Sequence, residues 1–452
     1  MNTVREKMMI PVMMVGAFLG SLSQNMLASA LSTILAEFQV SALVGQWLTT
    51  IYLLILGVIT VLTAVLFQRV RTRVLLETSL LLFAVGCFMA LFAPSFWFLL
   101  LSRAIQACGA GVLIPVLQMV LIHLYPAEKQ GQALGLSGIV IGFAPAVGPS
   151  ASGLLIDSFG WRSLFLFLLV ATLLVVVAGF FTFRQVGDPK RPPLLLGSAL
   201  FYGVGFTLFM VAVTQFGNSG VPLAVSLSLS AAGIVVLGVF IRTQLRDAEP
   251  LLHLSLFKNH SMQTGTTLMV ITYTVMTSGT ILVPLYVQSI CGLSATLSGL
   301  SMLPGSLLLA ALSPIAGRLT DRMGIQKVVI AGLIFLLFGT GGYALVSANS
   351  PLIVTTCIYS IRSVGLAFLL MPLTAYAVNG LSLDEADHGM AILNSLRQIC
   401  GSLFSTLLTL AATALSADRD LDLTGFRAAG LISAAIVLVS LILWILPKHT
   451  HK

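Results

Sequence analysis

Long apolar runs separated by short polar stretches make up most of the chain. A helix that spans a lipid bilayer needs about 20 mostly apolar residues. Fourteen runs reach this length, and they lie at 10–35, 43–68, 74–93, 95–123, 133–157, 162–184, 193–217, 222–245, 262–290, 295–317, 326–347, 351–378, 389–415 and 427–447. The first run is too long for a signal peptide and lacks a small-residue cleavage site. The pattern therefore predicts an all-α polytopic membrane protein with 14 transmembrane helices.

The positive charges indicate how these helices are oriented. If the N-terminus is cytoplasmic and the helices alternate in direction, seventeen of the 23 Lys and Arg residues fall in cytoplasmic segments. Three fall on the outer side and three fall within spans. The positive-inside rule expects this bias, so both termini are predicted to be cytoplasmic.

Composition supports a lipid environment and excludes several classes of protein. The 452 residues are 58% hydrophobic and 8% charged, whereas an ordinary soluble domain carries about 25% charged residues. A soluble globule, a coiled coil and a disordered chain are therefore excluded. The net charge of +8 reflects membrane topology and does not indicate a nucleic-acid partner. The five cysteines contain no CxxC pair, so we expect free thiols, and neither a metal nor a cofactor is implied.

Two halves of the chain repeat one another. The segment 64–73 resembles 317–326 at an offset of 253 residues, and Arg103 corresponds to Arg362 at an offset of 259 residues. Parallel repeats in transporters place the substrate site near the membrane midplane, between the halves. We therefore expect two six-helix bundles joined by two inserted linker helices, with boundaries at 1–190, 191–250 and 251–452.

Four motifs carry a resemblance to a known family. They are GRLTDRMG at 317–324, RAIQACGAG at 103–111, APAVGPSASG at 144–153 and NSLRQ at 394–398. With these motifs the chain resembles the fourteen-helix drug–proton antiporter family of the major facilitator superfamily, over nearly its whole length. The resemblance implies the major facilitator fold, alternating access, and export of drug-like compounds in exchange for protons.

The resemblance assigns a gating role to the motif at 317–324. It implies a cytoplasmic latch that favours one conformation of the transporter, formed by Gly317, Arg318, Asp321, Arg322 and Gly324. Asp321 is expected just before the N-terminus of the helix at 326–347, where free N–H groups and the helix dipole favour an anion. The alternative is a solvated turn whose charges only set the topology.

The resemblance also assigns a gating contact to the antiporter motif at 144–153. The residues that carry it are Pro145, Gly148, Pro149 and Gly153. Prolines kink a helix and small residues let another helix approach closely. The implied partner is the helix at 295–317. The alternative is generic packing of small residues without a role in antiport.

The chain departs from the family at positions that matter for proton coupling. Relatives carry an acid in the first helix where this chain has Ser23, and the first copy of the loop motif has Gln68 and Arg71 in place of Asp and Gly. By elimination, we assign proton coupling to acids at the ends of spans. These are Asp157, Glu37 and Glu77.

Polar residues on the predicted cavity helices define a candidate substrate site. They are Ser23, Gln24, Asn25, Gln46, Thr50, Arg103, Gln106, Gln118, Tyr273, Thr277, Tyr359 and Arg362. Because burying an arginine is costly, Arg103 and Arg362 need partners such as carbonyls, amides like that of Gln106, water or an anionic ligand group. The alternative is that both arginines only hold helices together.

Two further polar features are expected to face water. His123 lies at the end of the span at 95–123, and the acidic cluster at 384–388 (DEADH) lies in the loop ahead of the span at 389–415. The cluster could bind a cation, but a solvated loop is the favoured interpretation. The sequence contains no Gly-rich phosphate-binding loop, so ATP-driven pumping is not expected.

These observations lead to a functional prediction. The chain is expected to be a monomeric secondary transporter in a bacterial cytoplasmic (inner) membrane, and its partners are a small-molecule substrate, protons and the lipid bilayer. It would export amphipathic drug-like compounds and confer multidrug or antibiotic resistance. The alternative is a flippase or exporter of anionic lipids or acidic metabolites. A polytopic membrane enzyme is less favoured because no catalytic cluster is evident.

Overall fold

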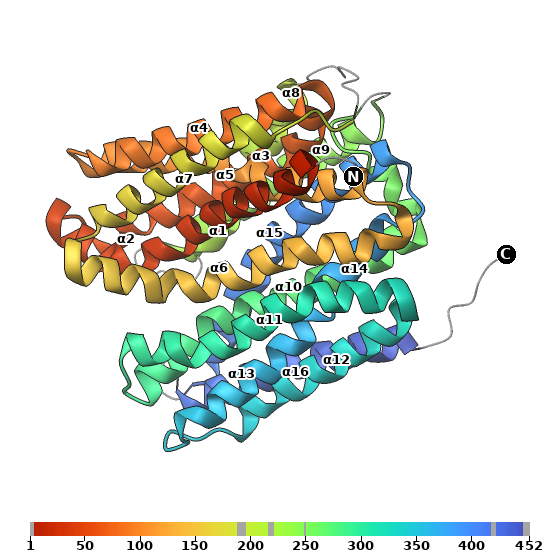
Figure 1. Cartoon of the computed structure of the whole chain (residues 1–452). Coiled ribbons are helices and arrows are strands. Elements are labelled where there is room, and N and C mark those ends of the chain that lie inside the picture. Colours follow the sequence, from red (N-terminus) through yellow and green to blue (C-terminus); the bar gives the residue numbers. More distant parts are fainter. Residues whose placement is uncertain (1–3, 188–195, 216–220, 248–249, 417–421, 446–452) are drawn as a thin grey trace. The chain divides into compact units, whose positions relative to one another are not determined.

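The computed structural model describes residues 4–187, 196–215, 221–247, 250–416 and 422–445, and all regular structure in these ranges is helical (Figure 1). The helices of the first part are α1 (Val4–Phe38), α2 (Ala42–Gly45), α3 (Trp47–Arg69), α4 (Thr72–Leu91), α5 (Phe96–Leu124), η1 (Ala127–Lys129), α6 (Gln130–Phe159), α7 (Arg162–Thr182), α8 (Leu196–Gln215) and α9 (Leu223–Gln244). The remaining helices are η2 (Leu254–Lys258), α10 (His260–Leu285), η3 (Tyr286–Ile290), α11 (Ala295–Met323), α12 (Ile325–Gly342), η4 (Tyr343–Leu345), α13 (Leu352–Ala367), α14 (Leu370–Val378), α15 (Leu383–Ala414) and α16 (Leu423–Ile445).

Each of the fourteen predicted apolar segments falls on a helix or on a pair of consecutive helices. Within the described residues, 11 helices are long and apolar enough to cross a membrane, and a shorter apolar helix covers Gly197–Val213. The all-helical prediction is therefore confirmed for this part of the chain. The number of fourteen membrane crossings stays a prediction.

The chain divides into two compact units, and two helices contribute to both. Unit 1 contains residues 1–126, 147–259 and 380–399, and unit 2 contains 127–146, 260–379 and 400–452. The first part of α6 thus packs with unit 2, and the first part of α15 packs with unit 1.

In unit 1, α4 packs closely against α5 and α7 (Figure 1). The helices α4 and α5 approach closely at Gly86, where a Cβ would overlap the backbone of Gln106. A side chain at this position would separate the two helices. In unit 2, α12 approaches α13 in the same way, because Gly339 lies directly against the backbone of Arg362. In both units, therefore, a glycine lets two helices meet backbone to backbone, next to Gln106 in unit 1 and next to Arg362 in unit 2.

The predicted helix at 351–378 is interrupted in the structure. It consists of α13 and α14, which are separated at Phe368 and Leu369. Pro372 explains the break, because proline has no N–H to donate to the carbonyl of Phe368 in a continuous helix. Arg362 consequently lies on the helix that precedes the break.

The corner between α11 and α12 requires a glycine. Gly324 has φ +82° and is the single residue between the two helices, and this left-handed region is costly for residues with a Cβ. The equivalent corner between α3 and α4 holds Arg71 with φ −56°. The first copy of the loop motif can therefore dispense with its glycine because its backbone turns differently.

Candidate transport and gating sites

Arg103 lies at the centre of a buried polar network in unit 1. Its side chain is 1% exposed. One guanidinium nitrogen donates to the hydroxyl of Ser23 at 2.8 Å and also to the Gln106 amide oxygen, while Nε donates to the Leu48 carbonyl at 3.5 Å. The guanidinium also lies 4.1 Å from the ring centroid of Tyr52. The expectation that an amide such as Gln106 would offset the burial of Arg103 is confirmed.

The network explains how Ser23 can replace an acid in the first helix. The Ser23 hydroxyl accepts from Arg103 and donates to the Gln106 Oε1 at 3.1 Å, and Gln106 Nε2 contacts the Cys87 sulfur at 2.8 Å. A hydroxyl can both accept and donate, whereas an ionised carboxylate only accepts. The hydrogen bonds present here therefore suit a serine, and they hold the arginine without a carboxylate among the contacts described.

Arg362 is held in a second network, in unit 2. Its side chain is also 1% exposed. Its NH2 group donates to the carbonyls of Val275 and Met276, the latter at 2.9 Å, and its guanidinium lies 5.5 Å from the Tyr359 ring centroid. Gly279 lies so close to the guanidinium that a Cβ would overlap it. Helix α10 thus presents backbone carbonyls to the arginine through a gap left by a glycine.

A small cavity lies beside Arg362 within unit 2. Its volume is about 20 Å³, and its lining includes Arg362, Tyr343 and Ser278. Sites for drug-sized ligands are about 300–1,000 Å³, whereas about 10–15 Å³ is enough for one water molecule. Within unit 2, Arg362 therefore faces a space for a solvent-sized group and not for a drug-like compound.

The remaining predicted cavity residues differ in burial, from Gln118, which is fully buried, to Gln46, which is exposed. Asn25 donates to the carbonyl of Ser21 at 2.7 Å, and Gln118 accepts from Asn394 at 2.7 Å on the first part of α15. In unit 2, Thr277 donates to the carbonyl of Gly401 at 3.2 Å. Of the other predicted cavity residues, Gln46 is exposed, whereas Gln24, Thr50 and Tyr273 are half-buried.

The loop-motif carboxylate binds a helix N-terminus, but not the predicted one. Asp321 lies in the last turn of α11 and accepts from the backbone N–H groups of Gly131 at 3.1 Å and Gln132 at 2.8 Å, in the first turn of α6. Asp321 does precede α12 (Ile325–Gly342) by four residues, but its carboxylate binds the start of α6 instead of the start of α12. The free N–H groups and the dipole of α6 favour the anion at this position.

Two glycines bring α6 and α11 into direct contact at this end. A Cβ on Gly317 would overlap the carbonyl of Gly131, and a Cβ on Gly131 would overlap Asp321. Farther along, Gly138 packs against the side chain of Ser313. Arg318 and Arg322 lie exposed on α11. The contact therefore depends on one carboxylate and a line of small residues.

The antiporter motif has a different neighbour from the one expected at its central glycine. A Cβ on Gly148 would overlap the Cβ of Asn25 on α1, whereas α6 approaches α11 through its earlier glycines. Nothing in the described residues lies near a Cβ on Gly153, and Pro145 is half-buried. The side chains of Pro149 and Asp157 lie outside the described residues.

The two other acids assigned to proton coupling are paired near the ends of helices. Glu37 contacts the guanidinium of Arg162 at 2.6 Å and accepts from the indole N–H of Trp161 at 2.6 Å. These interactions hold the pKa of Glu37 below its usual value, first through the Trp161 hydrogen bond. Glu77 pairs with Arg73 at 2.8 Å, one helical turn away. Each carboxylate therefore has a cationic partner at close range.

The acidic cluster at 384–388 is not a solvated loop. Residues 383–388 form the first turns of α15, and Asp387 and His388 are 2% and 5% exposed. A capping box begins the helix, since Glu385 accepts from the N–H and hydroxyl of Ser382 at 3.0 and 2.8 Å. The expectation that His123 faces water was also wrong, because its side chain is 10% exposed and its Nδ1 lies 3.6 Å from Asp387.

The burial of this cluster depends on contacts between distant segments. The sequence contains a Ser-x-x-Glu capping box that could have identified the start of α15. The burial of Asp387 and His388, however, depends on how α15 packs against α3 and α5 in unit 1. Gln68, for example, donates to the carbonyl of Asp384 at 3.4 Å. Such contacts between distant segments have no signature in a single sequence.

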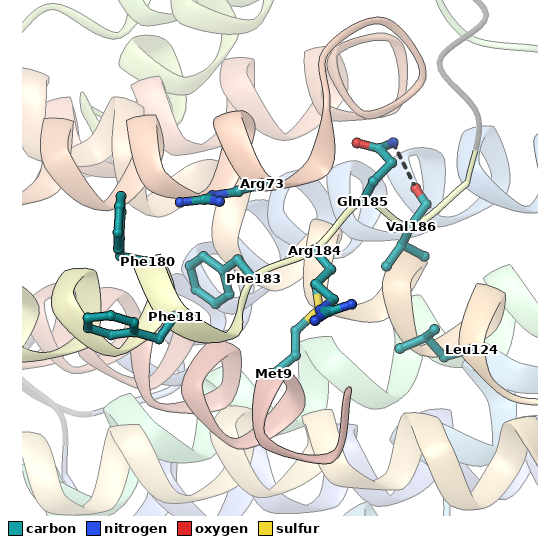
Figure 2. Close-up of a pocket in the computed structure, with 9 residues that line it drawn as sticks. All are labelled: Met9, Arg73, Leu124, Phe180, Phe181, Phe183, Arg184, Gln185 and Val186. Atoms are coloured by element: carbon teal, nitrogen blue, oxygen red, sulfur yellow. Dashed lines mark hydrogen bonds between the residues drawn. The ribbon is translucent and has the colours of Figure 1, made fainter. Parts of the chain in front are cut away.

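A larger pocket opens on unit 1 where α7 ends (Figure 2). Its volume is about 620 Å³, and its lining is Met9, Arg73, Leu124, Phe180, Phe181, Phe183, Arg184, Gln185 and Val186. The Arg73 guanidinium lies 4.8 Å from the Phe180 ring centroid. None of the predicted cavity residues lines this pocket, so it is separate from the candidate substrate site.

Comparisons with known proteins agree with the fold and the motifs. Residues 13–405 match the family model described as "Major Facilitator Superfamily". The lincomycin resistance protein LmrB of Listeria monocytogenes is 31% identical over 416 residues, which cover 92% of this chain and 88% of the relative. The riboflavin transporter RibZ of Clostridioides difficile is 26% identical, over 87% of this chain and 85% of the relative.

A solved structure shows the same fold at low sequence identity. The crystal structure of the human organic anion transporter MFSD10 superimposes with a TM-score of 0.68 at 15% identity, and the match covers 97% of this chain and 99% of that chain. The fold is therefore that of this superfamily, whose members are multi-pass transporters of small molecules in lipid bilayers and not enzymes. The chain belongs to the Major Facilitator Superfamily.

Proposed function

We propose that the chain exports amphipathic, drug-like compounds from the cytoplasm by alternating access, in exchange for protons. The observation that carries this proposal is the similarity to a lincomycin resistance protein over nearly the full length of both chains. We further propose fourteen membrane crossings, a bacterial inner-membrane location, cytoplasmic termini and a monomer. The domain boundaries at 1–190, 191–250 and 251–452 remain part of this proposal.

In this proposal the contact between α6 and α11 is the cytoplasmic latch. Asp321 and the small residues around Gly131 and Gly317 close this end of the transporter, and the latch breaks when the cytoplasmic side opens to load substrate. The hydrogen bonds at 2.8 and 3.1 Å support the role, because they hold a carboxylate from one sequence repeat on a helix start from the other. The antiporter motif acts with it by letting α1 approach α6 at Gly148.

An anionic substrate is the first alternative. Binding an anionic substrate would need a guanidinium that can reach the ligand, and the arginines of the two repeats are the candidates for this role. Arg103 and Arg362 are each 1% exposed and bound to groups of their own unit. The burial of both guanidinium groups favours a neutral or cationic drug over an anionic lipid or acidic metabolite, since the one nitrogen of Arg362 that has no hydrogen bond among the described residues lies beside a cavity of only about 20 Å³. The relative named as a riboflavin transporter supports a second alternative, a planar heterocyclic nutrient.

The test is a transport assay that offers all three classes. The chain is expressed in a bacterial strain without its own drug pumps, and growth is measured on lincomycin together with uptake of labelled riboflavin and a labelled anionic lipid analogue. We expect lincomycin resistance at least fourfold above the vector control. The matched inactive control is Gly317→Val, which places a side chain into the backbone of Gly131. Movement of riboflavin or the anion without drug resistance would overturn the drug assignment.

A further inference from the structure

The pocket at the end of α7 lies where four helices reach the boundary of the membrane (Figure 2). The apolar, membrane-length parts of α1, α4, α5 and α7 begin or end at Met8, Thr72, Leu124 and Thr182. The pocket is lined by residues at these same helix ends and by the segment that follows α7. Lipid headgroups lie at this depth in a bilayer, so a pocket of about 620 Å³ opens at headgroup level.

Two arginines supply the positive charge of the pocket. Arg73 comes from the first turn of α4, and Arg184 comes from the segment after α7 (Figure 2). Arg73 donates through Nε to Glu77 at 2.8 Å, and its two terminal nitrogens have no hydrogen bond among the described residues. Arg184 is exposed and forms no hydrogen bond or ion pair within the described part of the chain. Two guanidinium groups and one carboxylate leave a net positive charge.

The segment that carries Arg184 is fixed against the start of α4. Gln185 Oε1 accepts from the N–H of the buried Thr72 at 3.0 Å, and the Thr72 hydroxyl donates to the carbonyl of Val186 at 3.0 Å. The N–H of Val186 donates back to the same hydroxyl at 3.3 Å. Arg73 and Arg184 therefore line one pocket in a defined arrangement.

An exposed apolar face leads from the pocket along α7. Phe180 and Phe181 are 61% and 68% exposed although they line the pocket, and the Arg73 guanidinium lies 4.8 Å from the Phe180 ring centroid. Farther along α7, exposed apolar side chains recur every three or four residues, at Val177, Leu174, Val170 and Leu166. Because residues at this spacing share one face of a helix, the pocket is continuous with an apolar face that runs along the membrane-length part of α7.

These features match the two parts of a phospholipid. Guanidinium groups bind phosphate through charge-assisted, often bidentate hydrogen bonds, and basic pockets between helices at the membrane surface bind lipid headgroups. The net positive charge favours an anionic headgroup over a zwitterionic one. The exposed phenylalanines and the apolar face are complementary to acyl chains, whereas a soluble phosphate ester would leave this face uncovered.

We propose that the pocket binds the phosphate group of an anionic phospholipid whose acyl chains lie along the exposed face of α7. The bound phosphate joins the start of α4 to the segment after α7, so lipid binding stabilises unit 1. In the proposed orientation the lipid belongs to the cytoplasmic leaflet, which carries anionic lipids. The pocket is separate from the candidate substrate site, and the inference does not rest on the proposed substrate.

The test locates the lipid with a tryptophan in the pocket. Phe181→Trp places a fluorophore among the lining residues, and the purified full-length protein is reconstituted in phosphatidylcholine nanodiscs. Quenching of the added fluorescence, relative to protein without this substitution, is measured with brominated phosphatidylglycerol and with brominated phosphatidylcholine at the same mole fraction. The ratio of the two lipid occupancies gives the preference of this site for the anionic lipid.

We expect a preference of at least about fivefold, which is the effect of one arginine near an anionic membrane surface. Arg184→Gln should lower the preference, and Arg73→Gln together with Arg184→Gln should abolish it. Arg71→Gln is the matched control for Arg184→Gln, because the exposed Arg71 precedes α4 at the same corner but does not line this pocket. It removes the same charge and should keep the preference.

Equal losses in Arg71→Gln and Arg184→Gln would overturn the proposal, because the preference would then reflect only the general charge of this membrane face. Equal quenching by the two brominated lipids in the protein with both arginines would also overturn it. Relief of the quenching by millimolar glycerol phosphate at constant ionic strength would identify a soluble phosphate ester as the ligand instead of a lipid.

A second measurement does not depend on the added tryptophan. Phosphatidylglycerol should raise the melting temperature of the unmodified protein and of Arg71→Gln, but not that of the double variant. If the double variant does not fold, Arg184→Gln decides, since its side chain has no described interaction to lose. A melting temperature that responds to the lipid equally in Arg184→Gln and Arg71→Gln would contradict the proposed site.

Discussion

Replacing Asp321 by asparagine should loosen the contact between α6 and α11 by a calculable amount. The carboxylate accepts two N–H groups, from Gly131 and Gln132, and asparagine can accept with one oxygen only and carries no charge. A hydrogen bond to a charged group contributes about 1.5–3 kcal/mol, and a charge at an exposed helix N-terminus about 0.3–1 kcal/mol. Because Asp321 is exposed, the lower ends apply and the loss is about 2 kcal/mol.

A loss of this size changes the population of the open contact by roughly 30-fold. Ser313 is a suitable reporter, since it is 1% exposed and packs against Gly138 in the same contact. A cysteine at this position, in protein without the native cysteines, should react with an impermeant maleimide roughly 30 times faster when Asp321→Asn is added. Asp321→Glu keeps the charge and should raise the rate by less than about threefold.

An unchanged reaction rate of the reporter in Asp321→Asn would show that the Asp321 carboxylate does not hold the contact. Equal effects of Asp321→Glu and Asp321→Asn would show that the charge at the start of α6 does not stabilise the contact. Circular dichroism of both variants would confirm that the helical content is the same.

Two further predictions concern stability. Gly86→Ala should lower the free energy of unfolding by about 1–3 kcal/mol, because the new Cβ overlaps the backbone of Gln106. Gly153→Ala should have little effect, because nothing in the described residues lies near its Cβ. Thermal unfolding in detergent measures both, and equal melting temperatures for the two variants would contradict the packing. Glu37→Gln should cost at most about 1 kcal/mol at pH 7. The Trp161 hydrogen bond lowers the pKa of Glu37 in the folded protein. The contribution of Glu37 to stability is therefore present above the unfolded-state pKa of about 4.3 and is lost as the pH falls through the lower folded-state pKa. The difference in stability between Glu37→Gln and the unmodified protein should vanish in acid.

The helices and the arginine partners could be predicted because they follow from local rules. A bilayer imposes the length of an apolar run, which is why each predicted segment falls on a helix. The cost of burying a guanidinium without a carboxylate nearby predicted carbonyls, amides such as that of Gln106, water or an anionic ligand group as partners of Arg103, and the structure contains a carbonyl and the Gln106 amide among them. In both cases the requirement comes from the lipid environment, which sets the length of an apolar run and makes an unpartnered guanidinium costly.

Other features could not be predicted because they depend on contacts between distant segments. Asp321 binds the start of α6, about 190 positions away in the chain, and Asp387 is buried because α15 packs against α5. The same limit explains Gly148, whose neighbour is Asn25 and not α11. A polar stretch such as 384–388 has the composition of a loop, and only its packing shows that it begins a buried helix.

The proposed drug export is driven by a proton gradient. It is tested most directly in proteoliposomes that contain the purified full-length chain, a fluorescent lipophilic cation and an imposed pH gradient, with gradient-free vesicles as the control. We expect the cation to move against its own gradient only when the pH gradient is present, and we expect this movement to be lost in Gly317→Val. The absence of movement under either condition, or equal movement with and without the gradient, would contradict it.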